Sequence, residues 1–426
     1  KKSSSKKYFR FKKGLQRFLK HIPYLGNGLI ALFRKIRDLL KRIIFPGNIF
    51  EDLGLDYIGP VDTLDVSKIC DVLEEAKSQK KVCLVHVLTH KGRGYAPAEE
   101  NPSLYHAVAP FDTEKGIVPS DKKTFSSEFG KILCDLAKRD PAICAVTAAM
   151  CDGTGLCGFS KGFPERFFDV GIAEGHAVAM CSGMAKQGML PVFAVSSSFL
   201  QRGYDMLIHD MALQRLHVVL GVDRAGLVGD DGETHQGLFD VAYLSTVHGL
   251  TLLAPASFAE MRSMLHRALY QLTGPVALRY PRGGENGYRA DHSQGAAAVL
   301  REGTDWTAVC YGTMTGEVLS AAEALDAEGI SVEVVKLNQL APLEPETVLT
   351  SVRKTGRLLV AEEVIQTGSI GVALAGAVAQ EGRALKALKL LNTGDRFVPH
   401  GTIPQLRKLL GINSDHIASV MREAER

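Results

Sequence analysis

The hydrophobic and polar positions from residue 120 to residue 285 alternate between two patterns. Short apolar runs predict buried parallel strands, and stretches with an apolar residue every three or four positions predict the helices between them. This alternation is typical of a parallel α/β sheet. The expected strands are 143–147, 191–198, 217–223 and 251–255. The expected helices are 122–139, 174–187, 201–214 and 258–272.

Residues 304–426 repeat the same alternation, which predicts a further α/β unit. Its expected strands are 307–311, 331–336 and 358–362. Its expected helices are 317–327, 345–355, 370–379 and 404–410. Residues 286–303 between the two blocks are polar and rich in glycine and alanine, so they predict a linker.

Residues 46–118 contain a shorter version of the pattern. A strand at 57–61, a helix at 65–78 and a buried parallel strand at 81–88 predict one crossover unit. A glycine-rich loop, HKGRGYAPAE, and the segment YHAVAPFD follow it. The fold class predicted for the whole chain is therefore α/β, with three doubly wound, mostly parallel units of which the first is incomplete.

The net charge of +3 is unevenly spread along the chain. Residues 1–45 hold fourteen Lys or Arg and one acid, Asp38, so they carry +13 and the remaining residues carry 3 − 13 = −10. The bases alternate with Phe, Leu and Ile, as in a basic amphipathic helix that binds a membrane or a nucleic acid. The pattern equally fits a connector that packs one apolar stripe on its own protein, and a connector is the prediction.

Length and cysteine content narrow the class of protein. A chain of 426 residues is too long for one core, so two or three domains are expected. The eight cysteines form no CxxC pair and no zinc-type spacing, which predicts free thiols and a cytoplasmic protein. Cys151 and Cys157 flank a glycine turn, CDGTGLC. No apolar run reaches the roughly 18 residues of a membrane span, and neither a membrane span nor a nucleic-acid partner is expected.

One carboxylate stands out because its neighbours are small and apolar. Glu174 lies in DVGIAEGHAVAM, where few neighbouring side chains are polar. Burying it without a partner would cost several kcal/mol. It is therefore either a helix N-terminal charge close to water or the partner of a bound group.

Further polar residues follow other strands of the same unit, at the edge where open α/β sheets bind ligands. Arginines in such loops can hold a phosphate, and a histidine there can transfer protons near neutral pH. Each residue also has a structural explanation, such as a core aromatic ring, a loop cap or a surface ion pair. The candidates after the strands are Phe199, Arg202, Asp223, Arg224, Asp230, Asp231, His235 and Arg282.

Several long motifs closely resemble one family, the 1-deoxy-D-xylulose-5-phosphate synthases of the transketolase superfamily. The motifs are DVGIAEGHAVAM, SSFLQRGYDMLIHDMALQ, DRAGLVGDDGETHQG, KGRGYAPAE, YHAVAPFD, TAAMCDGTGL and YPRG. The resemblance extends from about residue 46 to the C-terminus. It implies a connector at 1–45, the tail of an N-terminal domain at 46–118, a pyrimidine-binding domain at 119–285, a linker at 286–303 and a transketolase C-terminal domain at 304–426.

The resemblance also implies a cofactor and a reaction. The cofactor would be thiamine diphosphate with Mg²⁺, and pyruvate would condense with glyceraldehyde 3-phosphate, releasing CO₂, to give 1-deoxy-D-xylulose 5-phosphate. This product is a precursor of isoprenoids, thiamine and pyridoxal. By this resemblance, Glu174 would hydrogen-bond the aminopyrimidine of the cofactor, and Phe199 would stack on it, with Arg202 beside them. Arg224 and Arg282 would bind the phosphate of the aldehyde. Proton transfer in the substrate pocket would fall to His106, His235 and Asp231.

The chain departs from the family at the magnesium site. The family uses a GDG motif with an Asn about thirty residues later, and no such pair is found in this sequence. The metal ligands are therefore expected outside this chain, which would act as a homodimer or with a complementing N-terminal chain. Smaller departures are Thr63 and Leu64 in place of Gly-His, Gly175 in place of Gln, and Ser196 in place of Tyr.

Two other functions remain open at this point. The chain could be a non-catalytic or regulatory relative that kept the fold, because the diphosphate anchor is missing while Glu174 and His235 are present. It could also be a beta-type subunit of a 2-oxoacid dehydrogenase, which pairs with a separate diphosphate-binding subunit. The DRAGLVG…THQG loop argues against this second alternative.

Overall fold

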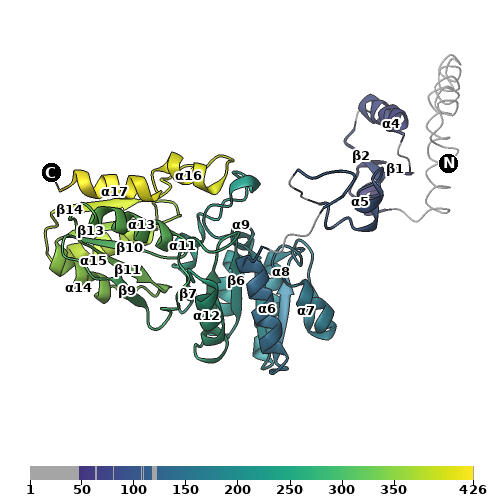
Figure 1. Ribbon diagram of the computed structural model, residues 1–426. Coiled ribbons are helices and arrows are strands. Elements are labelled where there is room, and N and C mark those ends of the chain that lie inside the picture. Colours follow the sequence, from purple (N-terminus) through teal and green to yellow (C-terminus); the bar gives the residue numbers. More distant parts are fainter. Residues whose placement is uncertain are drawn as a thin grey trace, which may run out of the picture. The chain divides into compact units, whose positions relative to one another are not determined.

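The computed structural model describes residues 48–62, 65–79, 81–106, 108, 110–117 and 122–425. The basic segment 1–45 and the Thr63–Leu64 departure lie outside these residues. The chain divides into two compact units, Lys1–Pro119 and Ser120–Arg426 (Figure 1). The two units are described separately below.

The first unit contains the expected crossover of strand, helix and strand. Strand β1 (Asp56–Asp62) pairs in parallel with β2 (Cys83–Leu88), and α4 (Val66–Ser78) connects them. The shorter helices α3 (Ile49–Asp52) and α5 (Ala96–Glu100) lie before and after this crossover in the chain. The expectation that β2 is buried is wrong, since none of its residues is buried. A sheet of two strands is too narrow to be covered on both faces by one connecting helix.

The second unit contains a seven-stranded sheet in the order β12-β7-β8-β6-β5-β3-β4. Its strands are parallel except for β12, which pairs antiparallel with β7 at the edge. They are β3 (Ile143–Thr147), β4 (Phe167–Asp169), β5 (Leu190–Ser196), β6 (Val219–Asp223), β7 (Thr251–Leu253), β8 (Val276–Arg279) and β12 (Gln339–Ala341).

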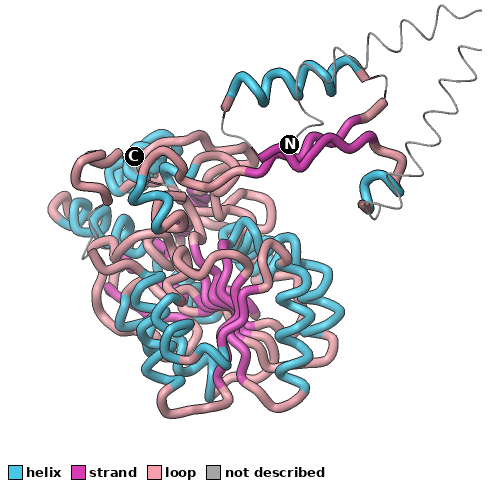
Figure 2. The backbone as a smooth tube through the Cα atoms, turned by 90° about the vertical axis from the view of Figure 1, so that its right-hand side faces the viewer, coloured by secondary structure: helices cyan, strands magenta, loops and turns pink. Residues whose placement is uncertain are grey.

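Helices cover both faces of this sheet, as the doubly wound prediction requires (Figure 2). Helices α6 (Phe125–Ala137) and α12 (Phe258–Tyr270) pack on one face, and α8 (Glu174–Lys186) packs on the other. Alternate residues of each strand contribute side chains to the cores on the two faces of the sheet, because successive side chains point in opposite directions. In β5, for example, Val192 faces α6 and Phe193 belongs to the core on the α8 side.

The C-terminal part of this unit forms a five-stranded sheet in the order β14-β13-β10-β11-β9. The strands are β9 (Ala297–Arg301), β10 (Trp306–Cys310), β11 (Val332–Leu337), β13 (Arg357–Ala361) and β14 (Ala387–Leu391). The helices are α13 (Met314–Asp326), α14 (Glu346–Thr355), α15 (Ile370–Gln380), α16 (Ile403–Leu410) and α17 (Ser414–Glu423). Strand β9 lies inside the range expected to be a linker, because its antiparallel pairing with β11 is a long-range contact.

The expected helix at 201–214 is not continuous. It consists of a 3₁₀ turn η2 (Gln201–Gly203), α10 (Tyr204–Met206) and a π-helical segment η3 (Leu207–Ala212), and α9 (Ser197–Leu200) precedes it. The break occurs where the chain passes close to α8, since a Cβ at Gly203 would lie 2.9 Å from the Val178 side chain. Irregular helical turns of this kind often occur at functional sites. The remaining short elements are α7 (Cys157–Gly162), η1 (Pro164–Arg166), η4 (Gly229–Asp231) and α11 (Asp240–Leu244).

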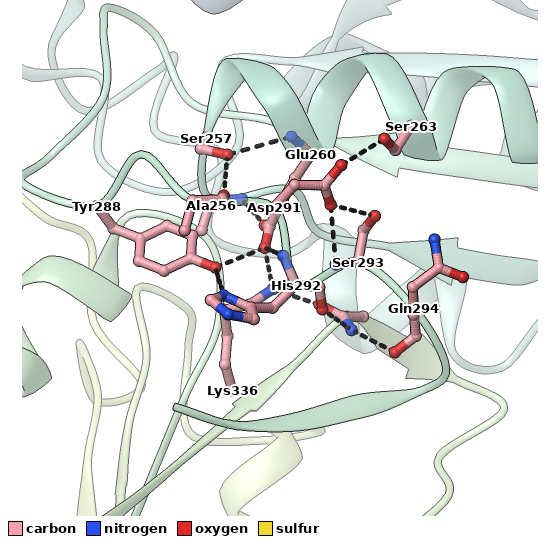
Figure 3. Close-up of polar contacts among 12 residues, drawn as sticks. Ala256, Ser257, Glu260, Ser263, Tyr288, Asp291, His292, Ser293, Gln294 and Lys336 are labelled. Carbon is pink, nitrogen blue, oxygen red and sulfur yellow. Dashed lines mark hydrogen bonds and ion pairs between the residues drawn. The ribbon is translucent and has the colours of Figure 1, made fainter. Parts of the chain in front are cut away.

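A buried ion pair joins helix α12, which packs on the seven-stranded sheet, to strand β11 of the five-stranded sheet. Lys336 on β11 lies 2.8 Å from the carboxylate of Glu260 on α12, and both side chains are 0% exposed (Figure 3). The same carboxylate accepts hydrogen bonds from the Tyr288 hydroxyl at 2.9 Å and from the backbone amides of Ala256 and His292. Burial lowers the pKa of Lys336, and the charge of Glu260 acts in the opposite direction. Removing either partner would leave the other charge buried without compensation, which destabilises the folded chain.

We predict that Lys336→Met destabilises the chain by about 3–5 kcal/mol, because it leaves the Glu260 carboxylate buried without its cation. The double variant Lys336→Met/Glu260→Gln should recover part of this loss, since a neutral amide needs no counter-charge. Urea denaturation followed by circular dichroism measures both. Lys131→Met, an exposed position on α6, is the control and should change the unfolding free energy by less than about 0.5 kcal/mol. Equal midpoints for wild type and Lys336→Met would contradict the prediction.

A second buried carboxylate lies at the end of β6, at the edge where open α/β sheets bind ligands. Asp223 is the last residue of the strand and is fully buried, with the Arg224 guanidinium 3.4 Å away. Burial raises the pKa of Asp223 to about 6, while the positive charges of Arg224 and Arg282 act in the opposite direction. The carboxylate is therefore held in place at an energetic cost.

This cost predicts a specific dependence of stability on pH. The folded chain binds the Asp223 proton more tightly than the unfolded chain, so stability falls as pH rises from about 4 to about 6 and then levels off. Asp223→Asn has no carboxyl group to titrate at this position, so its stability lacks this fall between about pH 4 and about pH 6. Its unfolding free energy relative to wild type should therefore rise by up to about 3 kcal/mol across that range. Denaturation at pH 4.5, 5.5, 6.5 and 7.5 tests it, with exposed Asp415→Asn as the control for loss of any carboxylate. A difference that is independent of pH would refute the assignment.

Candidate active site

Glu174 is the first residue of α8 and is buried, with a side chain only 2% exposed. No side chain caps this helix start. Instead, the guanidinium of Arg202 contacts Oε1 of Glu174, while the Arg202 side chain itself remains 53% exposed. The carboxylate thus begins a helix but is buried rather than close to water, and its partner within the protein is Arg202. A bond from Glu174 to a bound group stays a prediction.

Arg202, Phe199 and His235 form a layer beside this carboxylate. The guanidinium carbon of Arg202 lies 4.8 Å from the centre of the Phe199 ring. The His235 ring meets the Phe199 ring edge-on, with centroids 5.3 Å apart, and its Nδ1 lies 2.8 Å from the Thr234 hydroxyl. The structure therefore brings together four of the residues selected from the sequence.

The loop that carries His235 is closed by two glycines. Gly226 and Gly237 pair through backbone hydrogen bonds of 2.7 and 2.8 Å, so the DRAGLVGDDGETHQG segment returns to its start. A Cβ at Gly237 would lie 2.1 Å from the Arg224 carbonyl oxygen, which only glycine avoids. The Gln236 side chain fixes the loop further by accepting from the Val228 amide. The loop position of His235 is thus determined by local backbone contacts.

The two arginines expected to bind phosphate are each held by an oxygen of the protein. Arg282 forms an ion pair with Asp231 at 2.7 Å, and Arg224 donates to the Gly153 carbonyl oxygen at 2.8 Å. Both lie near enough to Asp223 for their positive charges to offset part of the rise in its pKa that burial causes. Asp231, expected to handle protons, is therefore a partner of Arg282 in this structure.

His106 is in the other unit. It is exposed in a turn where its amide donates to the Ser103 carbonyl. Its neighbour Tyr105 packs with Tyr95 and Phe111, with ring centroids 5.5 Å apart in each case. The two motif segments GRGYAPAE and YHAVAPFD thus fold against each other, and the role expected for His106 stays a prediction.

Two positions that depart from the family's pattern lie close to the cluster. A Cβ at Gly175 would lie 3.0 Å from the Met206 side chain, so a larger residue there requires Met206 to move. Ser196 ends β5 and is buried, with its hydroxyl 3.2 Å from that of Ser198.

The sequence analysis missed the residues that shape the backbone around Glu174. Asp169 accepts from the amides of Ala149 at 2.8 Å and Gly171 at 2.9 Å, which holds the loop before α8. Met150 accepts from the Ser196 amide through its sulfur. The aspartate of the DVG motif was a usable signal for this role, whereas Ala149 and Met150 carry none.

The described residues contain neither a cluster of metal-ligating side chains nor a membrane-spanning helix. They contain no group of three or more His, Cys, Asp or Glu side chains placed to hold a metal ion. No helix within the described part of the chain has the length and apolarity needed to cross a membrane.

Three family models match successive parts of the chain. The 1-deoxy-D-xylulose-5-phosphate synthase model matches residues 1–89, the pyrimidine-binding domain of transketolase matches residues 121–285, and the C-terminal domain of transketolase matches residues 295–417. The chain is also similar to a solved structure described as a split-gene transketolase, an inactive β4 tetramer, with a TM-score of 0.62 and 28% identity. That match covers 71% of this chain and 98% of the other.

Relatives that match nearly the whole of this chain belong to the same family as the first of these models. The 1-deoxy-D-xylulose-5-phosphate synthase of Heliobacterium modesticaldum is 43% identical over 98% of this chain and 65% of its own length. Synthase 1 of Geobacter sulfurreducens is 44% identical over 97% of this chain and 66% of its own length. This chain thus spans slightly less than two thirds of the length of these relatives. It belongs to the 1-deoxy-D-xylulose-5-phosphate synthase family, within the transketolase superfamily.

Proposed function

We propose that this chain provides the pyrimidine-binding and C-terminal domains of a thiamine-diphosphate enzyme that condenses pyruvate with glyceraldehyde 3-phosphate. CO₂ is released, and 1-deoxy-D-xylulose 5-phosphate is the product. The observation that carries the proposal is the buried Glu174 carboxylate at the start of α8, with Phe199, Arg202 and His235 beside it. Membership of the family supplies the reaction class.

The residues around Glu174 fit the aminopyrimidine end of the cofactor. Arg202 contacts Oε1, and no hydrogen bond from a described residue reaches Oε2, so this oxygen can accept one from a ring nitrogen. The Phe199 ring lies under the Arg202 guanidinium, next to the carboxylate, and would stack on the pyrimidine with its other face. When bound, thiamine diphosphate would supply a nucleophilic carbon and a cationic ring that accepts the electron pair left after decarboxylation. Glu174 would hold the proton at the pyrimidine nitrogen, and Arg202 keeps the carboxylate oriented.

The substrate side of the site would be formed by the loop residues. Arg282 and Arg224 would bind the phosphate of the aldehyde, with Arg282 exchanging its Asp231 partner for phosphate oxygens. The His235 ring meets the Phe199 ring edge-on, and His235 would transfer a proton to or from the substrate oxygen. We assign His106 the same kind of role, from the family's motif alone.

The remaining parts of the proposal concern groups outside the described residues. Mg²⁺ and the diphosphate would be bound by an N-terminal domain with a GDG motif, in a homodimer or on a complementing chain. We place the reaction in the cytoplasm, as the eight free thiols suggest.

The first test of the function is calorimetric titration of thiamine diphosphate with Mg²⁺ into this chain mixed with an N-terminal domain that carries the GDG motif. Binding and carboligation are expected in the mixture. Glu174→Gln should lower the carboligation rate by about 10²–10⁴ because an amide cannot hold the proton. Exposed Glu165→Gln is the control and should keep the rate of the wild type. Wild-type activity of Glu174→Gln would overturn the assignment, and no binding in the mixture would favour the non-catalytic alternative.

The second test concerns the phosphate. In the same mixture, Arg282→Ala should raise the Michaelis constant for glyceraldehyde 3-phosphate at least tenfold and that for pyruvate much less, because only the aldehyde carries a phosphate. Arg289→Ala, whose side chain is 86% exposed, is the matched control. Equal changes for both substrates would show that Arg282 does not bind the phosphate.

A further inference from the structure

Two cysteines meet across the glycine turn CDGTGLC, and the proposed reaction uses neither. The sulfur atoms of Cys151 and Cys157 lie 3.6 Å apart. Both side chains are partly exposed, whereas Cys144, Cys181 and Cys310 are buried. A disulfide needs the sulfurs at about 2.05 Å, so a displacement of about 1.5 Å would join them.

The turn between the two cysteines is fixed by backbone contacts. The Leu156 amide donates to the Cys151 carbonyl at 3.0 Å, and Gly155 adopts a positive φ of 75°. A Cβ at Gly155 would lie 2.1 Å from the Ser126 carbonyl oxygen, so the turn packs directly against α6. The backbone therefore presents the two thiols to each other without a large loop having to close.

We propose that Cys151 and Cys157 form a reversible disulfide by exchange with a small-molecule disulfide such as oxidised glutathione. The proposal rests on the placement of the two sulfurs and does not depend on the proposed reaction.

The exchange balances in two steps. The Cys151 thiolate attacks one sulfur of the small disulfide, forms a mixed disulfide and releases one small thiol. Cys157 then gives its proton to the Asp152 carboxylate that accepts its hydrogen bond, attacks Cys151 Sγ as the thiolate, and releases the second small thiolate, which takes up that proton. The protein loses two electrons and two protons, and the small disulfide is reduced to two thiols that carry those protons.

A neighbouring carboxylate distinguishes the two cysteines. The Cys157 thiol donates to the carboxylate of Asp152 at 2.7 Å, whereas the Cys151 sulfur faces the Ser160 hydroxyl at 3.8 Å. Burial and the charge of Asp152 raise the pKa of Cys157. Because Cys157 holds its proton more tightly, it is less often the thiolate that attacks the small disulfide, so the first attack comes from Cys151.

The disulfide would form next to a residue that is proposed to bind the substrate phosphate. The turn that it would draw together carries the Gly153 carbonyl, which accepts from Arg224. Oxidation would therefore act on the backbone that supports a residue proposed to bind phosphate.

The test is thiol counting under denaturing conditions. The folded chain is equilibrated with oxidised glutathione, quenched in acid, alkylated in denaturant and weighed by mass spectrometry. We expect two of the eight cysteines to escape alkylation, a mass about 2 Da below that of the reduced chain before alkylation, and localisation to the tryptic peptide 140–161. Dithiothreitol should restore all eight thiols.

Three variants make the result specific. Cys157→Ser should stop at a single glutathione adduct on Cys151, and Cys151→Ser should lose the internal disulfide. Cys134→Ser removes another partly exposed thiol near this turn and should still lose two thiols on oxidation. Full alkylation of the oxidised wild type would overturn the proposal. A disulfide that joins Cys134, on a different tryptic peptide, to either residue would overturn it too.

Discussion

A carboxylate buried at the start of a helix must have a partner, and the site is arranged around this requirement at Glu174. The small residues of α8 allow the broken segment after β5 to approach closely, which places Arg202 against the carboxylate. Arg202 in turn covers the Phe199 ring, and Phe199 meets His235 from the next loop. One electrostatic need thus connects three segments that are well separated in the chain.

The same principle holds the second unit together at its centre. The Glu260–Lys336 pair links α12 to β11, and β12 adds an antiparallel edge to the seven-stranded sheet from beyond the linker range. Arg407 joins α16 to Glu363 through a buried ion pair at 2.6 Å, next to the loop of residues 224–237. Buried charges of this kind contribute little net stability compared with apolar packing, but they penalise any other arrangement of the elements they join.

Much of the architecture was predictable because its elements have local signals. Ile143–Thr147 is a short run of apolar and β-branched residues and forms β3 with the expected bounds. The amphipathic pattern of 258–272 corresponds to α12, which Ser257 caps. Elements without such a signal were missed. Strand β9 has the composition of a linker and becomes a strand only through β11, and β4 is three residues that pair with β3.

The sequence by itself determined the fold class, because the periodicity of apolar residues is a property of the local chain. Its motifs determined the family through their resemblance to it, and they supplied the candidate residues of the site. Only the tertiary structure decided how those residues are paired. It placed Arg202 on Glu174, Asp231 on Arg282 and the Gly153 carbonyl on Arg224. It also brought the Cys151 and Cys157 sulfurs to 3.6 Å. Such pairings depend on where the backbone brings distant segments within a few ångströms, and no local pattern of side chains encodes that distance.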